Sequence, residues 1–177
     1  MPRSTDDSQL GPRVRTMQIV VVAMLVGCAS ALVILASIPN ARPARPANAA
    51  PLVTYIGLGF AVLTAALSFV MPVAIVAGAR TRIANGTFGD PRVVVPSDDT
   101  GKLLGVYQTA LIIWSALLEG PTFFLAIAYY LEGQIPSLVA GGVLTGLLAA
   151  RFPTPARVTA WLDRQLGLID QARHGRT

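Results

Sequence analysis

The sequence predicts an all-α integral membrane protein with four transmembrane helices, and composition and apolar patterning lead to this class. Of the 177 residues, 53% are hydrophobic and only 13% are charged. A typical soluble domain has about 25% charged residues. The mean hydropathy is +0.59. Four apolar runs each approach or exceed the roughly 20 residues needed to cross the hydrocarbon core of a bilayer.

The predicted spans follow in order as residues 17–38, 52–78, 103–131 and 135–150. The first is uncharged and ends before Pro39-Asn40, and the second contains Pro72. The fourth has only 16 residues and is rich in glycine. It pairs with the third as a hairpin through Glu132-Gly133-Gln134, which favours a span in spite of its length.

The distribution of Lys and Arg predicts that both termini are cytoplasmic. Twelve of these residues lie in the tail 1–16, the second loop 79–102 and the tail 151–177, whereas the first loop has two. Basic residues gather on the cytoplasmic side of membrane proteins, so these three segments should be cytoplasmic. The location expected is a bacterial cytoplasmic (inner) membrane. The basic residues form no single patch, so we expect the lipid bilayer as a partner and no nucleic acid.

Two processing alternatives concern the first span. The segment Leu25-Val26-Gly27-Cys28 has the spacing of a lipoprotein cleavage box, and Ala47-Asn48-Ala49 resembles a signal cleavage site. The apolar run continues past Cys28, however, and it is longer than the 7–15 residues of a signal peptide. An uncleaved first helix is therefore favoured. With one Cys and one His in the chain, no disulfide, metal site or cofactor site is expected.

The C-terminal tail predicts an amphipathic helix over residues 155–171. Thr154 is a favourable N-cap, and Pro155 suits the first helical position. Apolar residues recur at helical spacing at Val158, Trp161, Leu162, Leu166 and Ile169. This pattern is typical of an interfacial helix on the cytoplasmic leaflet. The alternative is a cytoplasmic cap packed on the bundle.

Glu119 lies near the middle of the third run and is the only Asp, Glu, Lys, Arg or His in the four spans. An ionisable side chain inside a bilayer is costly and marks a candidate functional site. At 100° per residue it shares one stripe with the other polar side chains of that run, which are Gln108, Ser115, Thr122 and Tyr130. The stripe should face the bundle, a partner subunit or a hydrated path. Without a cation nearby, the carboxyl group should be protonated.

Proline predicts helix kinks in the second and third spans. Pro121 removes a backbone donor and frees the carbonyl of Leu117, and Gly120 can absorb the distortion. Pro72 frees the carbonyl of Ser68 in the same way. A protonated Glu119 could donate a hydrogen bond to the Leu117 carbonyl or to Ser115.

The segment Ala116-Leu117-Leu118-Glu119-Gly120-Pro121 follows another apolar helix and a polar loop. Over about residues 52–131 the chain resembles the carboxylate-bearing hairpin of ATP synthase c subunits. This resemblance implies that Glu119 carries a proton or sodium ion. It departs from that family in its longer loop, in Pro121 and in the sparse glycines of the second span. The whole chain also resembles uncharacterised bacterial four-span membrane proteins.

Three functional hypotheses follow. The leading one is a non-enzymatic scaffold or accessory subunit with a membrane protein partner or a second copy, in which Glu119 is a buried polar contact. The alternative is a proton- or ion-carrying subunit of an oligomeric complex. An enzyme is not expected, because catalytic groupings are incomplete. In the fourth span, Gly142 and Gly146 form a small-xxx-small surface, which favours packing within the chain over self-association.

Overall fold

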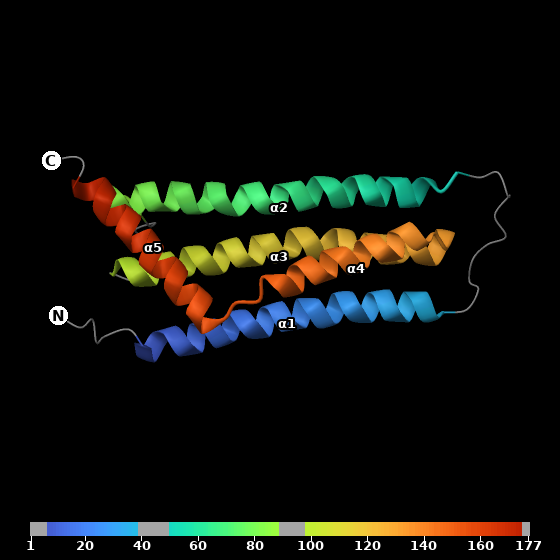
Figure 1. The fold of residues 1–177 in the computed structure, drawn as a ribbon, viewed down its shortest axis with the longest axis horizontal. Helices are drawn as coiled ribbons and strands as arrows, with labels where there is room; N and C mark the ends of the chain where they lie inside the picture. Colours follow the sequence, from blue (N-terminus) through green and yellow to red (C-terminus); the bar gives the residue numbers. More distant parts are fainter. Residues whose placement is uncertain (1–6, 39–49, 89–97, 175–177) are drawn as a thin grey trace. The chain divides into compact units, whose positions relative to one another are not determined.

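The computed structural model describes residues 7–38, 50–88 and 98–174. These residues form five helices and no strand, which confirms the all-α class (Figure 1). The helices are α1 (Asp7–Ser37), α2 (Leu52–Ala84), α3 (Asp99–Glu132), α4 (Ile135–Ala150) and α5 (Pro155–His174). Most of the proline-rich first loop lies outside the described residues, as does the segment 89–97 of the second loop.

Three helices extend beyond their apolar runs. α1 begins at Asp7 and not at Met17, α2 continues past Gly78 to Ala84, and α3 starts at Asp99. The predicted tail 1–16 and loop 79–102 are therefore partly helical. Apolarity marks only the hydrocarbon-length part of a helix, whereas the backbone hydrogen bonds can continue through residues of good helix propensity such as Ala and Arg. α4 has the bounds expected for the fourth run.

Side-chain caps form the starts of two helices, one of them the predicted start at Thr154. The Asp98 carboxylate accepts a hydrogen bond from the Gly101 N–H at 2.7 Å at the start of α3. The Thr154 hydroxyl accepts one from the Arg157 N–H at 3.3 Å, and α5 begins at Pro155. Such caps satisfy N–H groups that have no partner within the helix. The α3–α4 hairpin turns at Gly133, whose φ of +66° suits glycine.

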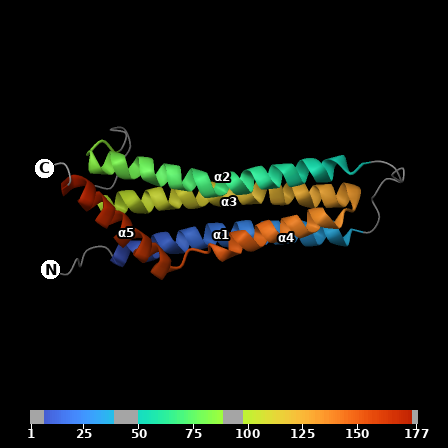
Figure 2. The ribbon, with the colours of Figure 1, turned by 45° about the horizontal axis from the view of Figure 1, so that its top comes forward.

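The chain divides into two compact units. Unit 2 comprises Ile19–Phe69 and Trp114–Phe152, and unit 1 comprises the remainder. Within unit 2, the segments of α1, α2, α3 and α4 lie side by side and alternate in direction (Figures 1 and 2). Each of the other three helices contacts α3. Gly27 of α1 faces Phe123, Phe60 of α2 packs edge-on against Phe124, and Gly141 of α4 faces Leu125.

The helix α2 turns small side chains into unit 2 and large ones outward. Its buried residues alternate at spacings of three and four: Thr54, Gly57, Ala61, Thr64 and Ser68. Its exposed residues in the same stretch include Tyr55, Ile56, Phe60, Val62, Leu63 and Phe69. Small residues at helix contacts and bulky apolar residues outside are typical of helices packed in lipid. A protein that faces water would bury the large side chains instead.

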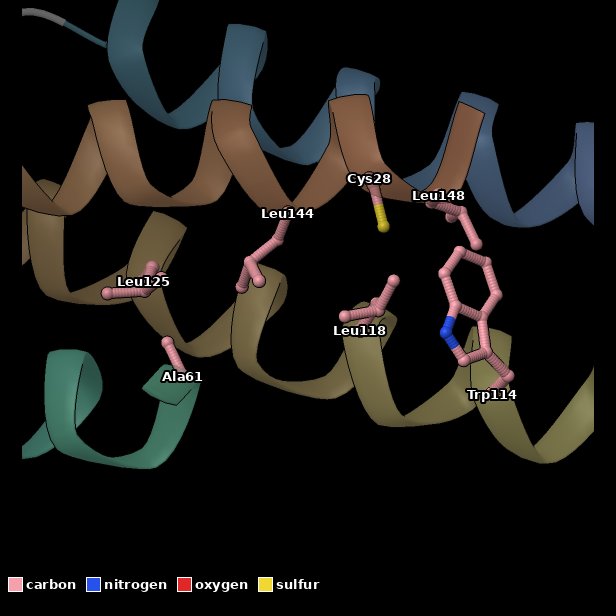
Figure 3. Packing of buried hydrophobic residues seen from close by; sticks show 7 residues of the cluster. All are labelled: Cys28, Ala61, Trp114, Leu118, Leu125, Leu144 and Leu148. Atoms are coloured by element: carbon pink, nitrogen blue, oxygen red, sulfur yellow. The ribbon is translucent and has the colours of Figure 1, made fainter. Parts of the chain in front are cut away.

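A buried cluster joins all four helices of unit 2. Figure 3 shows Cys28 of α1 pointing toward Leu118 and Trp114 of α3, while Leu144 and Leu148 of α4 reach the same layer. Leu125 and Ala61 extend the cluster toward α2. All seven side chains are less than 9% exposed. This cluster fixes the face of α3 that points inward.

Three helices are long and apolar enough to cross a membrane: α1 over Leu10–Ser37, α2 and α3. A fourth is added if α4 and α5, which meet at a bend of 70°, count as one broken span. These apolar helices are compatible with a membrane location.

In unit 1, α5 buries its apolar face within the protein. Val158, Leu162 and Ile169 are each no more than 3% exposed. The Trp161 ring packs on Tyr107 with centroids 4.9 Å apart. The Arg173 guanidinium pairs with the Asp99 carboxylate at 2.8 Å. These contacts agree with the cap alternative, and contact of α5 with a lipid leaflet stays a prediction.

Candidate functional site on helix α3

Glu119 lies on α3 at the boundary between the interior of unit 2 and its exposed surface. It is half-buried, whereas Leu118 beside it is 1% exposed and Gly120 is exposed. On the inner side its neighbour is Cys28 of α1, which is close enough to interact electrostatically with the carboxylate. Glu119 therefore lies at the edge of the buried face of α3, next to its exposed face.

The predicted polar stripe divides into two kinds of residue. Ser115 and Thr122 are fully buried, whereas Glu119, Tyr130 and Gln108 are half-buried. Gln108 belongs to unit 1 and the other four belong to unit 2. In unit 2 the structure thus brings Thr122 together with Glu119 around Cys28, and it leaves Tyr130 three turns further along the helix.

The hydrogen bonds expected for Glu119 are not formed with any residue that the structure describes. The Thr122 hydroxyl instead donates to the Leu118 carbonyl at 2.7 Å. The Ser115 hydroxyl is buried and has no partner among the described residues. The two residues differ in burial, since Ser115 is 0% exposed and Glu119 is half-buried. A buried hydroxyl without a partner is unusual and costs stability.

The open side of Glu119 carries small residues. Ala116 and Gly120 are exposed on successive turns of α3 and lie on either side of the carboxylate in sequence. A Cβ placed on Gly120 would meet nothing within 4 Å. The larger Ile112 and Phe123 flank them and are 39% and 37% exposed. Such a surface lets the backbone of another helix approach closely.

Both prolines that predict kinks lie inside continuous helices. Pro72 is within α2 and Pro121 within α3. Pro121 is buried, one position from the exposed Gly120. Near Pro72, the Ser68 hydroxyl donates to the Ala65 carbonyl at 2.6 Å. Pro72 belongs to unit 1 and Pro121 to unit 2.

The prediction that Gly142 and Gly146 pack within the chain is wrong. Both are exposed, and a Cβ on either would meet nothing within 4 Å. The close contact is made by Gly141, where a Cβ would lie 2.8 Å from Cδ2 of Leu32 on α1. Gly142 and Gly146 share one face of α4, as their spacing predicts, but this face is exposed. The buried face is formed by Gly141 and Leu144. The pair on the opposite face stays available for self-association.

Substitution of the two adjacent glycines should separate these roles. We expect Gly141→Leu to destabilise unit 2 by about 1–3 kcal/mol, because the side chain overpacks against Leu32. Gly142→Leu, its matched control, should change stability by less than about 1 kcal/mol. Unfolding in mixed detergent–SDS micelles measures both. Equal destabilisation by the two variants would contradict the assignment of the buried face.

A second carboxylate of unit 2, that of Glu132 at the end of α3, caps the N-terminus of α2. Its two oxygens accept hydrogen bonds from the N–H groups of Val53 and Thr54, at 2.9 and 2.8 Å. The Thr54 hydroxyl accepts a hydrogen bond from Ser137 at 3.0 Å. A carboxylate at a helix N-terminus satisfies free donors and complements the helix dipole. The sequence predicts Glu132 only as a turn residue between the third and fourth spans. Its capping role arises because the N-terminus of α2 lies beside this turn.

Removal of this cap should weaken unit 2. We expect Glu132→Ala to cost about 2 kcal/mol, because two N–H groups lose a charged acceptor. Glu132→Gln should cost less, since one carbonyl oxygen can still accept. Gln134→Ala is the matched control, because Gln134 is exposed in the same turn and forms no side-chain cap of α4. Chemical unfolding in detergent measures all three, and a neutral Glu132→Ala would refute the capping role.

The end of α4 carries an aromatic-bound arginine that the sequence patterns did not indicate. The Arg151 guanidinium lies 5.2 Å from the ring centroids of both Phe69 and Trp114. Cation–π contacts of this kind stabilise by about 0.5–2 kcal/mol. Arginine and tryptophan together are typical of the membrane–water boundary. Glu119 follows Trp114 by five residues, so it lies about 7 Å from Trp114 along the axis of α3.

The polar groups of this part of unit 2 are the carboxyl of Glu119, the thiol of Cys28 and the hydroxyls of Ser115 and Thr122. Within the described part of the chain, no three His, Cys, Asp or Glu side chains gather as a metal site. The site could exchange a proton at Glu119 or form a polar contact with another membrane helix. The chain matches no protein-family model, no curated protein and no solved structure.

Proposed function

We propose that this protein is a non-enzymatic accessory or scaffold subunit of a membrane complex. The observation that carries the proposal is the half-buried Glu119 beside the exposed Ala116 and Gly120. A carboxyl group that faces lipid is unfavourable, whether charged or neutral, because its polar atoms lack partners. Contact with a second protein would satisfy these atoms. The site is then incomplete in a single chain.

We further propose four spans with both termini on the cytoplasmic side of a bacterial inner membrane. In unit 2 each helix contributes 16–19 residues. This corresponds to about 24–29 Å of helix, which is close to the thickness of the hydrocarbon core. Arg151 and Trp114 are then boundary residues, and the twelve Lys and Arg residues lie on one side. Reporter fusions at each terminus test this topology, and a reporter active only outside the cytoplasm would refute it.

Extraction of the native complex tests the accessory role. In a mild detergent, the wild-type chain should migrate as a complex larger than its own mass of 18.6 kDa. Gly120→Leu should release the single chain, because the added side chain blocks close approach. Gly59→Leu is the matched control, since Gly59 is also exposed and a Cβ there would meet nothing within 4 Å. A wild-type chain that is always alone would refute the proposal.

A proton- or ion-carrying subunit is the second candidate. It is favoured by the polar groups around Glu119, namely the Cys28 thiol and the hydroxyl of Thr122. In this role Glu119 alternates between a protonated and an ionised or ion-bound state. A carbodiimide should then label Glu119 covalently, and more slowly at high pH. Glu119→Gln should abolish proton flux in proteoliposomes, whereas an unchanged flux would exclude the carrier role.

A further inference from the structure

We propose that the partner is a membrane helix of another protein that carries a basic side chain at the depth of Glu119. The docking surface on α3, which we call the Glu119 face, consists of Ala116, Glu119, Gly120 and Phe123. The inference rests on the proposed accessory function and adds the chemistry of the partner. It depends on the charge and the shape of this face.

The charge of the Glu119 face is not balanced within the chain. Glu119 forms no hydrogen bond or ion pair with the described residues, and the thiol of Cys28 is an electrostatic neighbour. The four predicted spans contain no Lys, Arg or His. A carboxylate in a low-dielectric environment is stabilised best by a cation at contact distance. A basic side chain from another helix is the complement that this surface lacks.

The shape of the Glu119 face fits a helix more closely than lipid chains. Ala116 and Gly120 are exposed one turn apart on α3, and a Cβ on Gly120 would meet nothing within 4 Å. Two helices that meet at small residues approach closely, so that a polar group between them is shielded from lipid. The carboxylate is placed at the edge of this contact, within reach of a long side chain from the partner.

A second copy of this chain does not supply the missing charge. Contact between two Glu119 faces would place one carboxyl group against another and would bring no cation to either of them. The exposed face of α4, which includes Gly142, Val143 and Gly146, also carries no Lys, Arg or His. A copy could pair with this chain through α4, but that contact would leave Glu119 unsatisfied. The observations therefore favour a different protein.

Synthetic helices provide a direct test. The full chain, labelled with a fluorophore near its C-terminus, is placed in neutral phosphatidylcholine vesicles, so that lipid charge does not attract the probes. The probes are Leu/Ala helices of about 20 residues. They carry Arg, Gln or Leu at the depth of Glu119 and an acceptor dye at one end. Energy transfer against peptide density measures the affinity of each.

The Arg helix should bind the wild-type chain about 30-fold more tightly than it binds Glu119→Gln, as expected for loss of one partner of a shielded ion pair. Gly120→Leu should weaken the same helix, whereas Gly59→Leu should not. The Leu helix should bind the wild-type chain and Glu119→Gln alike. Protection of the Cys28 thiol from labelling in each variant shows that unit 2 is folded, because Cys28 is the only cysteine and is fully buried.

Equal binding of the Arg, Gln and Leu helices to the wild-type chain would overturn the inference. Energy transfer between two labelled copies that disappears in Glu119→Gln would also overturn it, because the occupant would then be a second copy. The native complex separates this inference from the proposed function. If that complex persists in Glu119→Gln but is lost in Gly120→Leu, the accessory role stands and the basic partner is excluded.

Discussion

Gly57→Leu should destabilise unit 2 by about 3 kcal/mol, which is at the upper end of the range for overpacking a buried contact. A Cβ at this position would already lie 3.0 Å from Cδ1 of Phe124 and 3.1 Å from Cδ2 of Leu125. The Phe124 ring is also held edge-on by Phe60, so it cannot simply rotate away. The added side chain must therefore separate α2 from α3.

The matched control for this prediction is Gly59→Leu on the same helix. Gly59 is exposed with nothing within 4 Å of a Cβ, so its replacement should be neutral or slightly stabilising. The rate at which a thiol-reactive dye labels Cys28 reports the opening of unit 2, since that thiol is buried. Measured against the SDS fraction in mixed micelles, the midpoint should fall only for Gly57→Leu. Similar midpoints for both variants would contradict the packing of α2 on α3.

Ile169→Ala should release α5 from unit 1. Ile169 is completely buried, and truncation of a buried isoleucine costs about 2–5 kcal/mol through lost burial and the cavity left behind. The surface ion pair between Arg173 and Asp99 contributes at most about 1 kcal/mol and cannot compensate. Tryptic cleavage at the exposed Arg164 should therefore accelerate by more than about tenfold, because cleavage follows local opening of the helix.

Leu166→Ala is the informative control for α5. Leu166 lies on the predicted apolar face but is only half-buried, so its truncation should cost less than about 1 kcal/mol. If contact with lipid held α5 in place, the two variants should behave alike in vesicles. Equal acceleration of tryptic cleavage in vesicles would therefore favour the interfacial helix over the cap.

The comparison of α4 with α2 shows why helix position was easier to predict than helix facing. The bounds of α4 follow from an apolar run between a turn and a basic end. Its facing could not be predicted, because Gly141, Gly142 and Gly146 are equally apolar and equally small. Only the approach of Leu32 from α1 distinguishes them. The small stripe of α2 presents the same problem, since Gly57 and Gly59 differ in nothing but their surroundings.

The candidate site shows the same limit. Glu119 stands out in the sequence because a carboxylate in an apolar run has a cost that depends on composition alone. Its placement at an edge, with Cys28 on one side and Gly120 on the other, depends on where α1 packs. Glu132 gives no such signal, because a carboxylate in a turn is ordinary. Its role appears only when the N-terminus of α2, 79 positions away in the chain, lies beside it.

The sequence by itself determined the all-helical class, the apolar runs, the helix start at Thr154, and the identity of Glu119 as the polar exception. These are local properties, since backbone hydrogen bonding, capping and hydropathy involve residues within a few turns of one another. The tertiary structure alone decided which glycines are buried, which side of Glu119 is open, and that Glu132 caps α2. Those properties arise from contacts between helices, and small apolar residues carry little information about the neighbour that they will meet.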